Sequence, residues 1–393
     1  MSTLKFIFKS LLKPLRRRKK ASGFTLIELL VALILTFLII TPLLSLVISF
    51  MTTDRQEQAK NSSQQEIQAA LDYMAQDMQQ SIYIYDATAL SKGNDSDDPS
   101  LSGIQDQIPP FANTVDGCQS PTTCVPVLAF WKRKYFDRSD TVKDPVTGNN
   151  QQIKAIDDGS NGSDKFVYSL VVYYLIKDNA PTWSPVARIG RFEIRDGIVS
   201  PASVGSNTPT YLLRPDLGFA PFDLSAAPGN LIQSMNSWTK AAPVYNQQVV
   251  TLVDYIDDTP YDSVTNLLPG VQIQFIPPIN NAVNNAGYPI STEGQPLGNT
   301  GCVERTGADS SRVPPGPIPP ELGTGSFYAC VNPRDEQGQS VVQVFLRGNA
   351  LPRLNTNPQT WAITSANVTT QLSYRPIANV RVAVRGLLSS ETE

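Results

Sequence analysis

Residues 23–51 read GFTLIELLVALILTFLIITPLLSLVISFM, and this stretch decides how the chain is organised. No charged residue occurs in the 23 positions of residues 29–51. An α-helix rises about 1.5 Å per residue, so this length reaches about 35 Å and exceeds the roughly 30 Å of a bilayer's hydrocarbon core. A secretory signal has a shorter apolar region followed by an A-x-A cleavage site, which does not occur here. We therefore predict a transmembrane helix over residues 24–51.

A basic cluster, RRRKK, occupies residues 16–20, directly before the apolar stretch. Residues 1–23 contain eight basic residues and no acid, and removing these charges from the formal net charge of −3 leaves −11 on the rest of the chain. Clusters of Lys and Arg stay on the cytoplasmic side of a membrane, so the chain from residue 52 onward is predicted to be translocated. An acidic body also argues against binding to nucleic acid.

The composition excludes several kinds of catalytic site. The chain has 393 residues and no histidine, which removes Ser-His-Asp and Cys-His catalysis and histidine metal ligation. The sequence also lacks a P-loop, a G-x-S-x-G elbow and a dinucleotide-binding fingerprint. We therefore expect no enzymatic activity and no cofactor.

The four cysteines form an even set, which in an exported body suggests two disulfides. Three connectivities are possible, and the simplest pairs neighbours in sequence, Cys118 with Cys124 and Cys302 with Cys330. Each bond would stabilise the fold by roughly 2–4 kcal/mol. The alternative is a set of free buried thiols. Structural zinc is disfavoured because no C-x-x-C pair exists.

Residues 52–86 continue the helical pattern, because they contain neither Gly nor Pro and are rich in Gln, Ala and Glu. Apolar residues recur there every three or four positions, which marks one face of a helix. We expect that amphipathic face to pack on a sheet, so a single helix is predicted from residue 24 to about residue 85. The face consists of Ile67, Ala70, Leu71, Met74, Met78 and Ile82.

Residues 87–393 predict a head rich in strands. Runs of β-branched and aromatic residues alternate with long loops dense in Pro, Gly, Asp and Ser. The run at residues 165–177 is the strongest, and residues 187–199 are expected to pair with it as an antiparallel hairpin. The fold class is therefore α+β, with the long N-terminal transmembrane helix packed on an antiparallel β-sheet head. The predicted strands are residues 126–136, 165–177, 187–199, 247–256, 270–276, 340–348 and 367–375.

An acidic cluster follows one of these strands. Asp254, Asp257 and Asp258 lie within VDYIDDTPYD, so they are candidate calcium ligands. A strand that ends in a turn rich in Asp gives the same pattern without a metal, and we favour that interpretation.

The segment KKASGFTLIELLVAL resembles the class III signal of type IV prepilins and type II secretion pseudopilins. That signal combines a basic leader, a small residue before the cut, an aromatic amino terminus and Glu at the fifth mature position. Gly23, Phe24 and Glu28 stand at those positions. The resemblance implies that a prepilin peptidase removes residues 1–23, that Phe24 is N-methylated, and that Glu28 meets the Phe24 ammonium of a neighbouring subunit. The alternative for Glu28 is a hydrated charge at the membrane edge.

Pro42 lies in the middle of the apolar span, where it removes one backbone hydrogen bond and kinks or locally unwinds a helix. The helices of pilins commonly carry such a proline. Helix melting during assembly and a tolerated membrane proline are both open at this point.

The resemblance implies a function in a filament. The head is similar to the larger minor pilins of the PilW or GspJ type, and its size and long loops resemble the cyanobacterial hormogonium polysaccharide secretion pseudopilins. We interpret the chain as a minor pilin or pseudopilin of the bacterial inner membrane, with a cytoplasmic N-terminus and a periplasmic head. Its expected partners are the prepilin peptidase, other pilins, and the inner-membrane assembly platform with its motor. The alternatives are an uncleaved, signal-anchored periplasmic binding or carbohydrate-active protein, and a major adhesive pilin.

Overall fold

The computed structural model describes residues 23–137, 139–153, 165–199, 210–227, 230–259, 311–314, 322, 325–332, 340–361, 363 and 367–384. The chain divides into two compact units, Met1–Gln56 and Glu57–Glu393.

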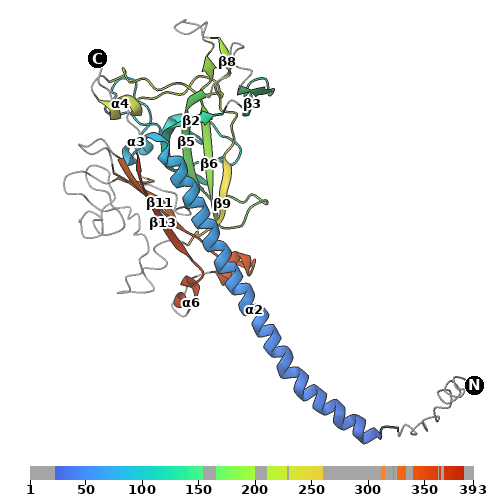
Figure 1. Cartoon of the computed structure of the whole chain (residues 1–393). Coiled ribbons are helices and arrows are strands. Elements are labelled where there is room, and N and C mark those ends of the chain that lie inside the picture. Colours follow the sequence, from blue (N-terminus) through green and yellow to red (C-terminus); the bar gives the residue numbers. More distant parts are fainter. Residues whose placement is uncertain are drawn as a thin grey trace, which may run out of the picture. The chain divides into compact units, whose positions relative to one another are not determined.

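The helix α2 (Leu26–Gln79) has 54 residues and contributes to both units (Figure 1). Thr25 caps its first turn, because the Thr25 hydroxyl accepts a hydrogen bond from the backbone N–H of Glu28 at 3.3 Å. The Thr36 and Thr41 hydroxyls donate to the carbonyl oxygens four residues earlier, at 2.7 and 2.8 Å. These bonds satisfy the two threonine hydroxyl groups within the helix itself, as a hydrocarbon environment requires.

The helix ends six residues before the predicted end at residue 85. Residues 81–84 form the strand β1 (Ser81–Ile84) instead, which pairs antiparallel with Phe130–Lys132 of another strand. The prediction was wrong here because the sequence SIYI has high strand propensity and a partner almost fifty positions away supplies the hydrogen bonds. The Ser81 hydroxyl donates to the Met78 carbonyl at 2.5 Å and satisfies a carbonyl of the last helical turn.

The amphipathic half of α2 packs into the core of the second unit. The apolar stripe predicted from its spacing is confirmed up to Met78, while Ile82 belongs to β1 and is half-buried. A core role for the two methionines is therefore confirmed. The buried apolar residues of the stripe are Ile67, Ala70, Leu71, Met74 and Met78.

The larger sheet is antiparallel and has the order β1-β2-β5-β6-β9 (Figure 1). The predicted strands at residues 126–136, 165–177 and 247–256 are confirmed, as is the hairpin of β5 and β6. The predicted strand at residues 187–199 is divided by Asp196 and Gly197 into β6 and β7. The bounds are β2 (Cys124–Phe136), β5 (Lys165–Ile176), β6 (Ala187–Arg195), β7 (Ile198–Val199) and β9 (Val250–Ile256).

A smaller antiparallel sheet has the order β10-β11-β12-β13, with the bounds β10 (Ser311–Val313), β11 (Phe327–Asn332), β12 (Ser340–Arg347) and β13 (Ile377–Val384). The predicted strand at residues 340–348 is confirmed. The strand predicted at residues 367–375 was wrong: α6 (Val368–Leu372) and a turn occupy these positions, and β13 starts at Ile377. The Arg375 guanidinium donates to the Gln371 carbonyl at 2.9 Å, a contact that a helical turn provides and an extended strand does not. The predicted strand at residues 270–276 lies outside the described residues.

The remaining described elements are short. Two further strand pairs and several single turns of helix lie between the strands of each sheet along the chain. They are α3 (Ala87–Ser91), β3 (Thr141–Lys143), β4 (Asn150–Gln152), β8 (Tyr211–Leu213), α4 (Leu231–Asn236) and the 3-10 turns Gln105–Gln107, Leu351–Arg353 and Pro358–Thr360.

One predicted disulfide is present as expected. Cys118 and Cys124 are bonded, with their Cα atoms 5.4 Å apart. Cys330 is also disulfide-bonded, and its predicted partner, Cys302, lies outside the described residues. Free buried thiols at Cys118, Cys124 and Cys330 are therefore excluded.

Candidate assembly site and supporting charge network

The predicted processing residues lie at the start of α2. Gly23, Phe24 and Thr25 precede the first helical residue, Leu26, and Phe24 is 77% exposed. A methyl group added at Gly23 would meet no atom of the described residues within 4 Å. Packing against the described residues therefore does not require glycine at this position, and backbone access for another molecule is its physical advantage.

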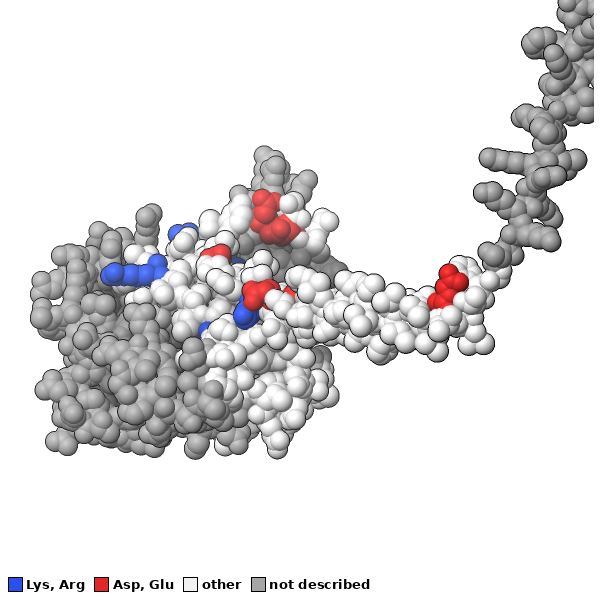
Figure 2. All heavy atoms as spheres, turned by 90° about the horizontal axis from the view of Figure 1, so that it is seen from below, with Lys and Arg blue, Asp and Glu red and all other residues white. Residues whose placement is uncertain are grey.

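Glu28 is the one acidic residue in a helical surface that is otherwise uncharged from Phe24 to Thr53. Figure 2 shows one acidic patch toward the end of a long uncoloured surface. Within the described part of the chain, the Glu28 carboxylate has no hydrogen-bond or ion-pair partner, although the helix N-terminus favours a negative charge there. A carboxylate that enters an apolar environment requires a partner, which this chain does not itself provide in the part described.

The apolar side chains from Phe24 to Met51 are exposed all around the helix. The helix is long and apolar enough to cross a membrane by length and composition. A helix that is apolar on every side is normally buried in a membrane or against other chains. Pro42 lies inside α2, and the helix continues on both sides of it, so the predicted kink or melting at this residue stays a prediction.

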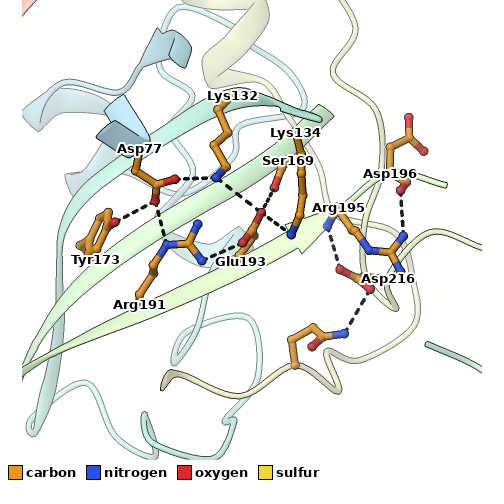
Figure 3. A network of polar contacts seen from close by, with 11 residues as sticks. Asp77, Lys132, Lys134, Ser169, Tyr173, Arg191, Glu193, Arg195, Asp196 and Asp216 are labelled. Atoms are coloured by element: carbon orange, nitrogen blue, oxygen red, sulfur yellow. Dashed lines mark hydrogen bonds and ion pairs between the residues drawn. The ribbon is translucent and has the colours of Figure 1, made fainter. Parts of the chain in front are cut away.

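In the second unit, Asp77 joins α2 to three strands of the larger sheet (Figure 3). Its carboxylate accepts hydrogen bonds from Lys132 Nζ of β2 at 2.5 Å, from the Tyr173 hydroxyl of β5 at 2.8 Å, and from Arg191 Nε of β6 at 2.8 Å. Burial alone would raise the pKa of Asp77, but Arg191 and Lys132 outweigh it and hold that pKa below its usual range. The carboxylate is therefore a charged anchor between helix and sheet.

Glu193 extends this network along β6 (Figure 3). Its carboxylate contacts Arg191 Nη1 at 2.7 Å, Lys134 Nζ at 3.0 Å and the Ser169 hydroxyl at 2.6 Å. Burial raises the pKa of Glu193, and the positive charges of Lys134, Arg191 and Lys132 lower it by more, so the group stays ionised. Asp77, Glu193 and their partners form what we call the helix–sheet charge network.

The sequence analysis did not identify this network. Two local signals could have indicated it: Asp77 interrupts an apolar helical face between Met74 and Met78, and RFEIR places Arg191, Glu193 and Arg195 on one face of a strand. Neither pattern names the partners, because these come from other strands.

The three candidate calcium ligands do not converge on a common site. Asp254 accepts hydrogen bonds from the Ser184 N–H and hydroxyl at 2.8 and 2.6 Å, and Asp258 pairs with Lys177 at 2.9 Å. Asp257 is fully buried and contacts Arg347 Nε at 2.7 Å and Arg375 Nε at 3.0 Å. Cationic and hydrogen-bonding groups of the chain already contact these carboxylates, which favours the interpretation without a metal, and calcium binding stays a prediction to be tested. The described residues contain no group of three His, Cys, Asp or Glu that could hold a metal ion.

Asp257 instead joins the two sheets. It lies just after β9 of the larger sheet, while Arg347 ends β12 of the smaller sheet and Arg375 lies between α6 and β13. Burial raises the pKa of Asp257, but the two guanidinium charges and the hydrogen bonds outweigh that effect and lower it.

Comparison with known proteins identifies one feature of the chain. Residues 18–44 match the family model described as the prokaryotic N-terminal methylation motif. No curated protein and no solved structure matches the chain. The matched residues contain the end of the basic cluster, Gly23, Phe24, Glu28 and Pro42, and they cover the start of α2. Together with the exposed apolar helix and the antiparallel head, the motif is consistent with a type IV pilin-like protein. It implies processing by a prepilin peptidase and assembly with other pilins, and it fits anchoring in a membrane.

Proposed function

We propose that this chain is a minor pilin or pseudopilin that is cut after Gly23, extracted from the inner membrane and stacked into a type IV pilus or a type II-like pseudopilus. The observation that carries the proposal is the coincidence of the methylation motif at residues 18–44 with a helix that is exposed and uncharged apart from Glu28. An inner-membrane platform and its motor would drive assembly, in support of motility or of polysaccharide or protein export. The chain performs no reaction of its own in this function.

The Glu28 carboxylate, which has no partner among the described residues, gives the assembly step a physical basis. Cleavage after Gly23 creates an ammonium group on Phe24, four residues before Glu28. In an axial stack, the Glu28 carboxylate of one subunit meets the Phe24 ammonium of the next. Two charges that are costly alone in hydrocarbon become tolerable as a pair, and the pair forms in only one register of neighbouring helices. Glu28 therefore selects the register, and the apolar surface supplies the contact area.

The size of the chain favours a minor subunit. Removing the 23 residues of the leader from 393 leaves 370 residues, which is bulky for the main repeating unit of a filament. We infer a priming component or one close to the tip of the filament. The abundance of the chain in sheared filaments distinguishes this role from that of a major pilin.

Glu28→Gln tests the proposed function most sharply. This substitution keeps the shape of the side chain and removes its charge, so cleavage after Gly23 should continue. Incorporation into filaments, or co-purification with other pilins after crosslinking in membranes, should fall at least tenfold, which corresponds to about 1.4 kcal/mol.

The matched control is Glu57→Gln, which changes an acid on the same helix whose side chain forms an exposed pair with Lys60 at 3.0 Å. This variant should assemble normally. Equal incorporation of Glu28→Gln and the parent chain would refute register selection by Glu28.

A further inference from the structure

An open cleft of about 790 Å³ lies on the second unit, beside the helix–sheet charge network. Its floor contains Lys134, Arg191 and Glu193, which are themselves members of this network and are labelled in Figure 3. One wall is the turn between β3 and β4, and the other is the segment of residues 246–248 that leads into β9. Tyr73 of α2 also lines the cleft.

The walls of the cleft are held by hydrogen bonds within the chain. Asn246 Nδ2 donates to the Pro145 carbonyl at 3.1 Å and thereby links the two walls. The Asp144 carboxylate accepts from the Thr147 N–H at 2.7 Å and fixes the turn of the first wall. Gln247 Nε2 donates to Asp216 at 3.1 Å on the second wall. Walls that are fixed by such bonds lose little conformational freedom when a ligand binds, which favours affinity.

The charges of the cleft disfavour an ionic ligand. The lining contains Lys134, Lys143, Arg191 and Arg195 together with Asp144, Glu193 and Asp216, so the two signs nearly balance. On the floor, Glu193 already contacts both Arg191 and Lys134, at 2.7 and 3.0 Å. An anionic ligand would have to compete with Glu193 for these two cationic side chains. A cationic ligand would be repelled by them.

The same arrangement suits a neutral ligand that carries many hydroxyl groups. A hydroxyl both donates and accepts hydrogen bonds, so neighbouring hydroxyls can accept from Arg191 or Lys134 and donate to Glu193 at once. The walls add side-chain amide and hydroxyl groups, of which Gln248 is exposed and Thr251 half-buried.

Apolar contacts are available at the edge of the cleft. Tyr73 is 44% exposed, and Val146 and Val250 are exposed by half or more. Each of these side chains can cover the C–H face of a sugar ring. The Tyr73 ring is the best suited of the three, because an aromatic ring is large and rigid. The cleft volume falls within the range of small-molecule sites and is sufficient for a short segment of a chain of sugars.

We propose that this cleft binds a neutral oligosaccharide. The site is separate from the methylation motif, and binding does not require cleavage after Gly23. The proposal therefore goes beyond the function proposed above and can succeed or fail independently of it.

The test uses the full-length chain in detergent micelles and isothermal titration calorimetry. The probes are neutral tetrasaccharides of glucose, xylose and N-acetylglucosamine, with tetragalacturonate as the charged counterpart. We expect at least one neutral probe to bind more tightly than tetragalacturonate. Absence of binding by every neutral probe, or tighter binding of the charged one, overturns the proposal.

Two variants locate the binding. Tyr73→Ala removes the ring and Gln248→Ala removes an exposed amide. Each variant should raise the dissociation constant of the best neutral probe about tenfold. Tyr135→Ala is the control, since Tyr135 is exposed to a similar degree, at 46%, and its side chain leaves β2 on the face opposite to that of Lys134. Gln248 is exposed, so Gln248→Ala should fold normally. The test of binding at the cleft therefore remains possible even if Tyr73→Ala unfolds. Unchanged binding in Gln248→Ala and in a folded Tyr73→Ala, or an equal loss in Tyr135→Ala, overturns the proposed location and with it the proposal.

Discussion

Replacing Asp77 by Asn should release α2 from the larger sheet without changing the shape of the side chain. In the parent chain the carboxylate is 6% exposed and contacts Lys132 at 2.5 Å, and Tyr173 and Arg191 at 2.8 Å each. Arg191 keeps its contact with Glu193 in the variant, whereas Lys132 is left with Glu193 at 3.8 Å. Breaking a buried ion pair costs about 3–5 kcal/mol of unfolding free energy. Because Arg191 and Lys132 keep Glu193 as a partner, we expect a loss at the lower end of this range, about 3 kcal/mol.

The assay is equilibrium unfolding of the full chain in detergent, followed by near-ultraviolet circular dichroism, which reports the packing of the head. We expect the free energy of unfolding to fall by about 3 kcal/mol and the midpoint temperature by roughly 4 °C. The matched control is Asp72→Asn on the same helix, where the carboxylate is exposed and accepts a hydrogen bond from Gln68. A surface change of this kind should alter stability by less than about 0.5 kcal/mol.

The pH dependence adds a second readout. The pKa of Asp77 is lower in the folded chain than its ordinary value of 3.8. Its contribution to stability is therefore complete above that ordinary value and is lost as the pH falls through the folded pKa. The difference in stability between the parent and Asp77→Asn should shrink below about pH 4. Stability of Asp77→Asn equal to that of Asp72→Asn at neutral pH would refute the role of Asp77 as an anchor.

Three further outcomes are expected. Asp257→Asn should cost about 3–5 kcal/mol of unfolding free energy in urea titrations, because buried Arg347 and Arg375 lose the negative charge that they contact; a loss below about 1 kcal/mol would contradict this role. Adding calcium or a chelator should leave the midpoint temperature of the parent chain unchanged, and a calcium-dependent rise would support the metal hypothesis for the aspartates after β9. Cys118→Ala should lower stability by about 2 kcal/mol, because the loop closed with Cys124 spans only six positions; the comparison is made by thermal unfolding, and an unchanged midpoint would show that this bond is dispensable.

The features that the sequence predicted well are local ones. The methylation motif that the family comparison matches at residues 18–44 is one continuous stretch of chain, and the spacing that buries Met74 and Met78 is a property of one helix. The strongest strands were found for the same reason, since β5 contains an unbroken run of β-branched and aromatic residues.

The features that the sequence missed depend on distant partners. The helix ends before Ser81 because residues 81–84 pair with β2 as a strand. The helix α6 occupies part of a predicted strand, and the Arg375 guanidinium donates a hydrogen bond to the Gln371 carbonyl. The sequence predicts only that Asp257 lies in a turn after a strand, whereas the structure shows that it contacts arginines 90 and 118 positions later in the chain. Neither spacing nor composition indicates which charges a fold will bring together.

The most direct test of the account is the N-terminus of the chain recovered from membranes that contain a prepilin peptidase. Intact-mass measurement with N-terminal sequencing should find a chain that begins at Phe24 with one added methyl group. The Gly23→Ala variant should retain the leader, although its side-chain methyl group meets no atom of the described residues within 4 Å. A parent chain that keeps residues 1–23, or begins at any residue other than Phe24, would contradict the account.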